Sequence, residues 1–141
     1  TTNGVLLMKL DLHGITWVKV SVNAGEKATY EAIHKAHPGD WNRVWRNIKD
    51  AVKRKGDCTL GVQMVLLPNN YDEVPALREM CDAAGVDYLV LKPYSQHRFS
   101  INKLDFKAPF VQSRGKTVVR YVALDTHNIP YDKCHATPHF W

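Results

Sequence analysis

Apolar and polar side chains alternate along residues 15–22, which is the pattern of a β-strand with two different faces. Valine fills one face at every second position, and Lys19 and Ser21 stand on the other. Asn23 follows just past the strand, in front of the turn residue Gly25. The valines predict a face covered by helices, and Lys19, Ser21 and Asn23 predict a polar row on the opposite face.

Helix and strand patterns then follow one another with short connections. The predicted elements are a helix at 27–35, a helix with Asp40 as its N-cap that ends before Gly56, a strand at 59–67, a helix at 72–84 and a strand at 86–94. This alternation predicts parallel strands joined by βαβ units, which is an α/β fold. Two extended runs around residues 113–116 predict a β-hairpin.

The composition limits the class of protein. The chain has 141 residues, 45% of them hydrophobic, which suits one globular domain. No apolar run reaches the ~18 residues of a bilayer span, so we expect no membrane association. The net charge of +5 comes from 19 basic and 14 acidic side chains, and much of the excess lies in the helix-end segment 49–56. Cations there complement a helix dipole, so we expect no nucleic-acid partner.

The three cysteines, Cys58, Cys81 and Cys134, are widely spaced and odd in number. This pattern argues against a disulfide framework and predicts a reducing, cytoplasmic setting. Cys58 precedes a predicted strand and Cys81 lies on the apolar stripe of a helix. We expect both to be small buried hydrophobic residues.

Neutral hydrogen-bonding side chains gather where the predicted strands end. Ligands of parallel α/β folds bind at the carboxyl ends of the strands. Asn3, Ser21 and Asn23 stand near the first two of these ends, and Gln63 and Lys92 belong to the next two strands. Amides and hydroxyls suit ribose hydroxyls, amino-acid carboxylates and purine edges. Because no paired carboxylates or Ser/His/acid set accompanies them, the pattern predicts a small-molecule site before it predicts a reaction.

The stretches "TTNG", "WVKVSVNAGEKATYEAIH", "WNRVWRNIKDAVKRKG" and "LGVQMVLLPNNYDEVPALREMCDAAGVDYLVLKPY" follow one another between Thr2 and about Ser95. Together they resemble the second half of the barrel of the radical S-adenosylmethionine (radical SAM) enzymes. The first resembles the Thr-Asn-Gly after the third strand of that family, and the second its fourth strand and turn. The third is similar to the next helix, and the fourth to strand five, its helix and strand six.

The resemblance implies a fold and an activity. Such enzymes use a partial (β/α)₆ barrel, so residues 1–98 would be the C-terminal half of the barrel and 99–141 an extension that contains the hairpin. A [4Fe–4S] cluster reductively cleaves S-adenosylmethionine, and the resulting 5′-deoxyadenosyl radical abstracts hydrogen from the substrate. The implied partners are this small-molecule cofactor and a substrate of unknown class, for which the extension favours a peptide or protein.

The resemblance also implies roles for particular residues. Ser21 and Asn23 would face the methionine or ribose part of the cofactor, and Asn3 would lie beside them. Gln63 would lie near the ribose or adenine. Leu91 and Lys92, at the end of strand six, would border the adenine, with Lys92 facing substrate as an alternative.

The sequence departs from the family's pattern in two ways. Asn23 stands where the family often has Asp. The Cys-x-x-x-Cys-x-x-Cys motif that ligates the cluster is absent, as is the glycine-rich segment that holds the amino-acid part of the cofactor. In the family both precede the Thr-Asn-Gly. We therefore expect a fragment that lacks the N-terminal half of its barrel and is inactive alone.

The tail "YDKCHATPHFW" resembles the start of a SPASM-like extension, in which Cys134 would ligate an auxiliary iron–sulfur cluster. A lone surface thiol, or a metal site of Cys134, His135 and His139, stays open as an alternative. For the whole chain two other functions stay open. One is a different (β/α)-barrel enzyme, such as a Schiff-base lyase with Lys92 as the amine nucleophile. The other is a non-catalytic module that binds a nucleotide.

Overall fold

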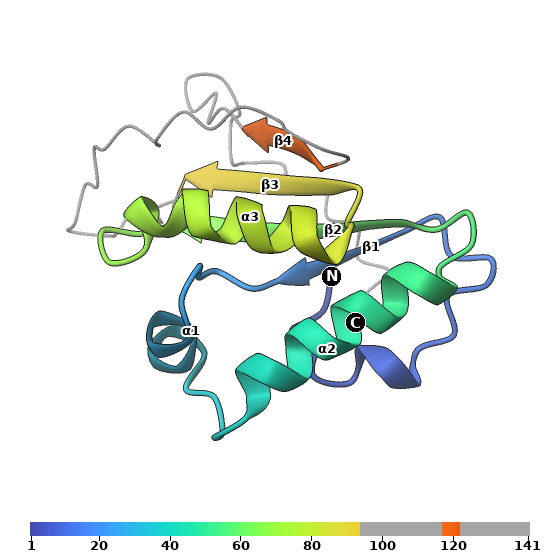
Figure 1. Ribbon diagram of the computed structural model, residues 1–141, viewed down its shortest axis with the longest axis horizontal. Helices are drawn as coiled ribbons and strands as arrows, with labels where there is room; N and C mark the ends of the chain where they lie inside the picture. The colour runs from blue at the N-terminus through green and yellow to red at the C-terminus, as the bar shows by residue number, and fades with distance from the viewer. Residues whose placement is uncertain (94–116, 122–141) are drawn as a thin grey trace, which may run out of the picture.

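The computed structural model describes residues 1–93 and 117–121 (Figure 1). Within them, one parallel sheet has the strand order β1 (Trp17–Ser21), β2 (Thr59–Leu66), β3 (Tyr88–Pro93) and β4 (Val118–Tyr121). The helices of the described residues are α1 (Lys27–His34), α2 (Asp40–Arg54) and α3 (Val74–Ala84), with short 3₁₀ turns η1 (Leu7–Lys9) and η2 (Tyr71–Glu73).

The predicted α/β class is confirmed. Every helix and strand expected between residues 15 and 94 is present, and all their boundaries agree within two residues. Asp40, expected as the N-cap, is instead the first residue of α2, and its carboxylate accepts a hydrogen bond from the backbone N–H of His37 at 3.1 Å. The helix expected from Asp72 begins as η2, and Pro75 lies in the first turn of α3, where its missing N–H costs no helical hydrogen bond.

The fourth strand comes from the segment that the sequence assigned to an extension. β4 pairs with β3 in parallel, with Leu89 opposite Val119 and Leu91 opposite Tyr121. One of the two runs of the predicted hairpin falls within residues 94–116, outside the described residues. The run that is described therefore extends the parallel sheet.

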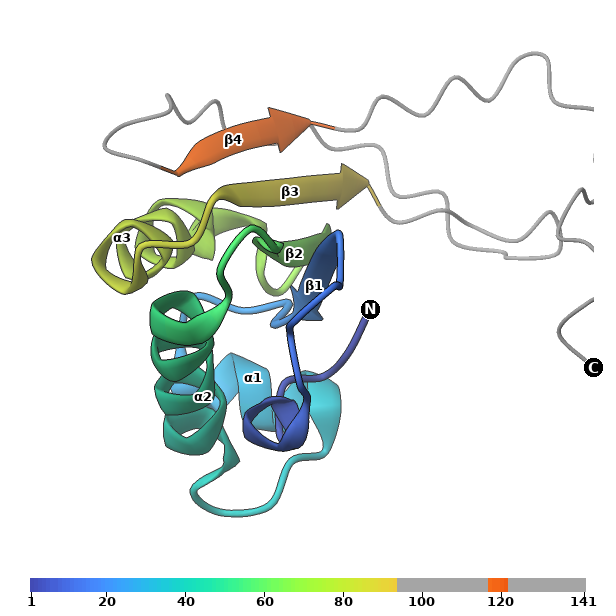
Figure 2. The same ribbon diagram turned by 90° about the vertical axis from the view of Figure 1, so that its right-hand side faces the viewer.

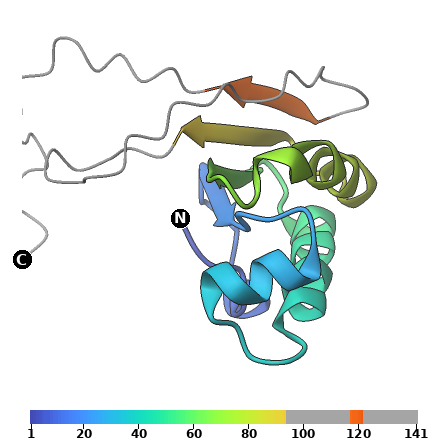
Figure 3. The ribbon, with the colours of Figure 1, turned by 90° about the vertical axis from the view of Figure 1, so that its left-hand side faces the viewer.

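One face of the sheet carries the hydrophobic core. The valines of β1 are buried there, as are alternate residues of the next two strands: Leu60, Val62, Met64, Leu66, Leu89 and Leu91. Figures 2 and 3 show, from opposite sides, that α2 and α3 cover this face and that α1 lies beside α2. The expectation that the valines face helices is confirmed. Trp41 and Trp45 of α2 are buried in the same core.

The first residues run alongside β1. Thr2 forms a parallel bridge with Val20 through two backbone hydrogen bonds of 2.9 Å. Gly4 follows with a φ of +83°, and a Cβ there would come 2.8 Å from Cγ1 of Val20. The buried amide of Asn47 in α2 donates to the carbonyl oxygen of Gly4 at 3.0 Å. The Thr-Asn-Gly turn is therefore fixed between β1 and α2, and glycine is the residue that fits it.

Candidate functional site

The sheet face opposite the core is the candidate site. Side chains alternate along a strand, and paired residues of parallel strands point to the same side. The register therefore puts one set of side chains on this face, which we call the open face: Trp17, Lys19, Ser21, Thr59, Gly61, Gln63, Val65, Tyr88, Val90, Lys92, Val118 and Arg120. None of the described helices lies against it (Figures 2 and 3). The polar row predicted on β1 thus belongs to a face without helical cover.

Ser21 and Gln63 occupy one row across the middle of the open face. They are paired residues of β1 and β2, and neighbouring strands lie about 4.8 Å apart, so the two side chains start from adjacent positions on the same face. Gln63 is in turn opposite Val90, which is opposite Arg120. Both polar side chains are partly exposed, and neither bonds to another residue of the described ranges. Two of the predicted contact residues therefore stand together with unused donors and acceptors.

Asn23 has a more constrained position than the sequence suggested. Its φ of 58° is in the left-handed region, which asparagine tolerates better than most residues. Its Oδ1 accepts a hydrogen bond from the backbone N–H of Val65 at 2.9 Å, which extends the pairing of β1 with β2. Its carbonyl oxygen accepts one from Nδ2 of Asn70 at 2.8 Å. The amide oxygen of Asn23 is thus engaged by the fold, which leaves its Nδ2 for a ligand.

The other predicted site residues lie away from the middle row. Asn3 is exposed, and its Oδ1 accepts a hydrogen bond from the backbone N–H of Val5 at 3.2 Å. Leu91 is 1% exposed and its side chain belongs to the core, so only its backbone can border a ligand. Lys92 is partly exposed on the open face. Cys134 lies outside the described residues.

Three cations stand on the open face without a described carboxylate beside them: Lys19, Lys92 and Arg120. None of them forms an ion pair within residues 1–93 and 117–121. Nζ of Lys19 lies 5.7 Å from the ring centroid of Trp17, and Cζ of Arg120 lies 5.1 Å from that of Tyr88. Aromatic faces therefore provide part of the surroundings that these charges need.

Lys19 and Lys92 interact although β2 separates their strands. Burial lowers the pKa of Lys19 from its usual value, and the charge of Lys92 and direct contact with its side chain lower it further. The register places both lysines on the open face, Lys19 opposite Gly61 and Lys92 opposite Val65 of β2. Lys19 therefore has a lysine of the same charge as a neighbour on the open face.

Tyr88 fills the space beside these cations. A Cβ on Gly61 would come 2.2 Å from the ring carbons of Tyr88, so the ring lies directly over the glycine. The tyrosine is 8% exposed. Burial raises the pKa of its hydroxyl, and the nearby charge of Arg120 opposes that shift. Gly61 is therefore required on the open face to seat the aromatic ring.

The turn between β1 and α1 is closed to anions. In α/β folds the N–H groups at such a helix start often bind phosphate. Here the carboxylate of Glu73 accepts hydrogen bonds from the backbone N–H groups of Gly25 at 2.8 Å and Glu26 at 3.0 Å, and from the hydroxyl of Thr29. A ligand bound at the open face would therefore rely on side chains rather than on this helix end.

Two kinds of feature are absent from the described ranges. No group of three or more His, Cys, Asp or Glu side chains there is arranged to hold a metal ion. Cys58 and Cys81 are buried in the core, as expected, and burial raises the pKa of the Cys81 thiol. The same ranges contain no helix with the length and apolar character of a membrane span.

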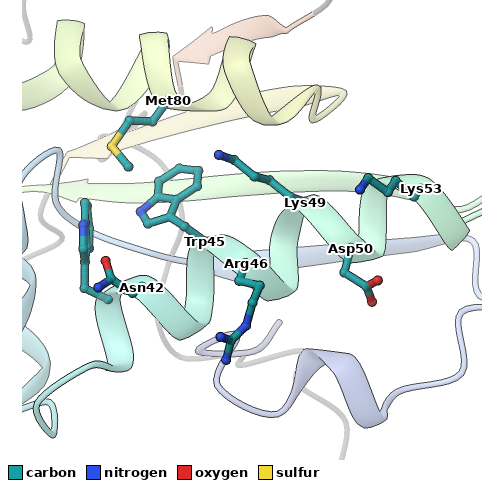
Figure 4. A pocket seen from close by; sticks show the side chains of 8 residues that line it. Asn42, Trp45, Arg46, Lys49, Asp50, Lys53 and Met80 are labelled. Carbon is teal, nitrogen blue, oxygen red and sulfur yellow. The ribbon is translucent and has the colours of Figure 1, made fainter.

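A groove lies on the helical side of the molecule (Figure 4). It lies between α2 and α3, and its lining includes Trp45, Arg46, Lys49 and Met80. Trp45 is only 5% exposed, so most of its ring is core. The groove lies on the opposite side of the sheet from the open face and contains no predicted site residue.

Neither a scan of protein-family models nor a search of curated proteins finds a match to the chain. The case for function therefore rests on the residues of the candidate site.

Sequence reasoning missed Arg120, Tyr88 and Gly61 as parts of the open face. The alternation in the strand around Arg120 was a usable signal, because it sets Val118 and Arg120 on one face and Val119 on the other.

Proposed function

We propose that the chain forms the C-terminal half of a radical SAM barrel and that its open face helps to bind S-adenosylmethionine. The observation that carries the proposal is the pair of adjacent, unbonded polar groups of Ser21 and Gln63 on a sheet face without helical cover. The order of parallel strands with helices on the opposite face supports it, since a (β/α) barrel needs both. The choice of family comes from the resemblance of the four ordered sequence segments to radical SAM enzymes.

The residues present fit the cofactor in part. S-adenosylmethionine carries ribose hydroxyls, an α-carboxylate and a purine edge, and the Ser21 hydroxyl, the Gln63 amide and Nδ2 of Asn23 supply donors and acceptors for such groups. When bound, the cofactor would supply a radical that takes hydrogen from the substrate. The role of Ser21, Gln63 and Asn23 would be to bind and orient the cofactor.

The described cysteines do not fit the iron–sulfur cluster. Cys58 is 2% and Cys81 0% exposed, both within the core, and no third ligand accompanies them in the described ranges. The cluster ligands would therefore come from a segment before Thr1. No step through the cluster follows from the residues of this chain.

A Schiff-base lyase is the second candidate, and one observation favours it. A lysine that attacks a carbonyl must be a free amine, which a lowered pKa promotes. On the open face burial lowers the pKa of Lys19, whereas the sequence predicted Lys92 as the nucleophile. Reduction by borohydride in the presence of a carbonyl substrate would then attach the substrate to Lys19.

The proposed function is tested on the protein expressed with any segment that its gene encodes before Thr1. We expect that segment to contain Cys-x-x-x-Cys-x-x-Cys, and the reconstituted protein to bind iron and sulfide as a [4Fe–4S] cluster. With a reductant it should form 5′-deoxyadenosine from S-adenosylmethionine. Replacement of the three cysteines of that motif by alanine is the control, and it should abolish both the binding of the cluster and the formation of 5′-deoxyadenosine. A protein that lacks the motif, or that holds the cluster and leaves the cofactor intact, would refute the proposal.

A further inference from the structure

We propose that the open face binds an oxyanion of the substrate, a carboxylate or a phosphate group, between Lys19, Lys92 and Arg120. The anion site itself rests on the placement of these three residues on one face of the sheet. Its assignment to the substrate, as opposed to the cofactor, rests on the proposed function.

The sheet register puts the three cations on one face, and two of them are neighbours there. Arg120 is opposite Val90 on β3, and Lys92 lies two residues further along the same strand, so these two are diagonal neighbours on one face. Lys19 lies on β1, on the far side of β2, and the charge of Lys92 contributes to the lowered pKa of Lys19. Gln63 stands between them on β2, with an amide that is unbonded in the described part of the chain. The area therefore offers three positive charges and one neutral hydrogen-bond donor.

The charges in this area are unbalanced, in contrast to those of two partly buried cations elsewhere in the described residues. Lys55 pairs with Asp87 at 3.0 Å, and Arg78 pairs with Asp82 at 2.7 Å. On the open face the described positions include no Asp or Glu at all. Like charges held together on a sheet destabilise it. Binding of an anion among these cations is favourable, because charge-assisted hydrogen bonds replace the repulsion between the like charges.

The surroundings favour an oxyanion over other ligands. A cationic ligand would be repelled by all three residues, and a neutral one would leave their charges uncompensated. The Tyr88 ring beneath Arg120 holds the guanidinium near the sheet. Guanidinium and ammonium groups are the usual partners of carboxylates and phosphates. The site adjoins the row of Ser21 and Gln63, so an anchored substrate would lie next to the proposed cofactor contacts.

The test is a titration of the 141-residue chain with inorganic phosphate, and in a second series with glutarate, in a buffer free of other oxyanions. The ¹³Cε resonances of ¹³C-labelled lysines are followed by NMR. Those of Lys19 and Lys92 should shift and saturate together, which gives a Kd. Lys19→Gln and Lys92→Gln should each raise that Kd at least about 10-fold, since each removes a charge-assisted hydrogen bond. Both residues are partly exposed, so we expect both variants to fold.

Lys53→Gln is the matched control, because Lys53 is an exposed lysine on α2, on the helical side of the sheet. It should leave the Kd unchanged. Shifts that grow without saturation, or an equal loss of affinity in Lys53→Gln, would overturn the anion site.

A second arm separates substrate from cofactor. In the protein that includes the segment before Thr1, S-adenosylmethionine is added to the phosphate complex. Retention of the Lys19 and Lys92 shifts supports a substrate site. Displacement of phosphate would overturn that assignment, because the cofactor's own carboxylate would then occupy the cations. If S-adenosylmethionine fails to bind while phosphate still does, the proposed function fails and the oxyanion site stands for a substrate of another enzyme.

Discussion

Replacement of Asn70 by alanine should lower the free energy of unfolding by about 3–4 kcal/mol, because three buried or half-buried backbone groups would lose their partner. Asn70 is fully buried. Its Oδ1 accepts a hydrogen bond from the N–H of Leu67 at 2.7 Å, and its Nδ2 donates to the carbonyl oxygens of Asn23 at 2.8 Å and Val65 at 2.9 Å. One side chain thereby joins the end of β2 to the turn after β1, beside the candidate site.

The measurement is equilibrium unfolding in urea, compared between wild type and Asn70→Ala. Asn69→Ala is the control, since the neighbouring asparagine is exposed and should change stability by no more than about 0.5 kcal/mol. Equal stability of the two variants would show that the three hydrogen bonds do not hold the turn. Total stability of a domain is typically about 5–15 kcal/mol, so the expected loss is a large fraction of it.

Gly25→Ala should destabilise the chain by about 2–3 kcal/mol, because the new methyl group would collide with backbone atoms. A Cβ at Gly25 would come 2.4 Å from the carbonyl oxygen of Glu73 and 3.0 Å from the backbone nitrogen of Leu77. These atoms belong to η2 and the start of α3 and cannot rotate away as a side chain could. The shift would also break the hydrogen bond from the Gly25 N–H to the Glu73 carboxylate.

Urea unfolding again provides the measurement, with Lys27→Ala as the control. Lys27 is an exposed residue in the first turn of α1, so its truncation tests the helix start without the collision. We expect only a small change for that variant. A Gly25→Ala protein as stable as wild type would mean that η2 moves freely relative to the turn after β1.

The elements of the fold were predictable because each has a local signal. Alternating valines mark β1, and the positions of Gly56 and Gly85 mark the ends of α2 and α3, where both glycines have positive φ. These signals depend on neighbours along the chain. The division of β1 into a helix-facing and a polar side was predictable for the same reason.

The arrangement of the site was less predictable, because it depends on residues far apart in sequence. Nothing in the strand around Arg120 indicates that it lies beside β3, and the sequence favoured a hairpin there. The pairing of Asn23 with Val65 and Asn70 also needs the register of β1 and β2. The local sequence pattern around a polar residue at a strand end is the same whether its side chain bonds within the fold or binds a ligand. The cofactor role of Ser21 and Gln63 stays a prediction, whereas the oxygen of Asn23 bonds within the sheet.

The affinity of the cluster-loaded protein for S-adenosylmethionine, measured for Ser21→Ala beside Thr59→Ala, is the most direct test of a cofactor site on the open face. Both residues lie on that face with exposed or partly exposed hydroxyls, but Thr59 stands at the opposite, N-terminal end of its strand. We expect Ser21→Ala to bind about 10-fold more weakly, as for the loss of one hydrogen bond, and Thr59→Ala to bind like wild type. Equal affinities in the two variants and wild type would show that the cofactor does not bind at this row.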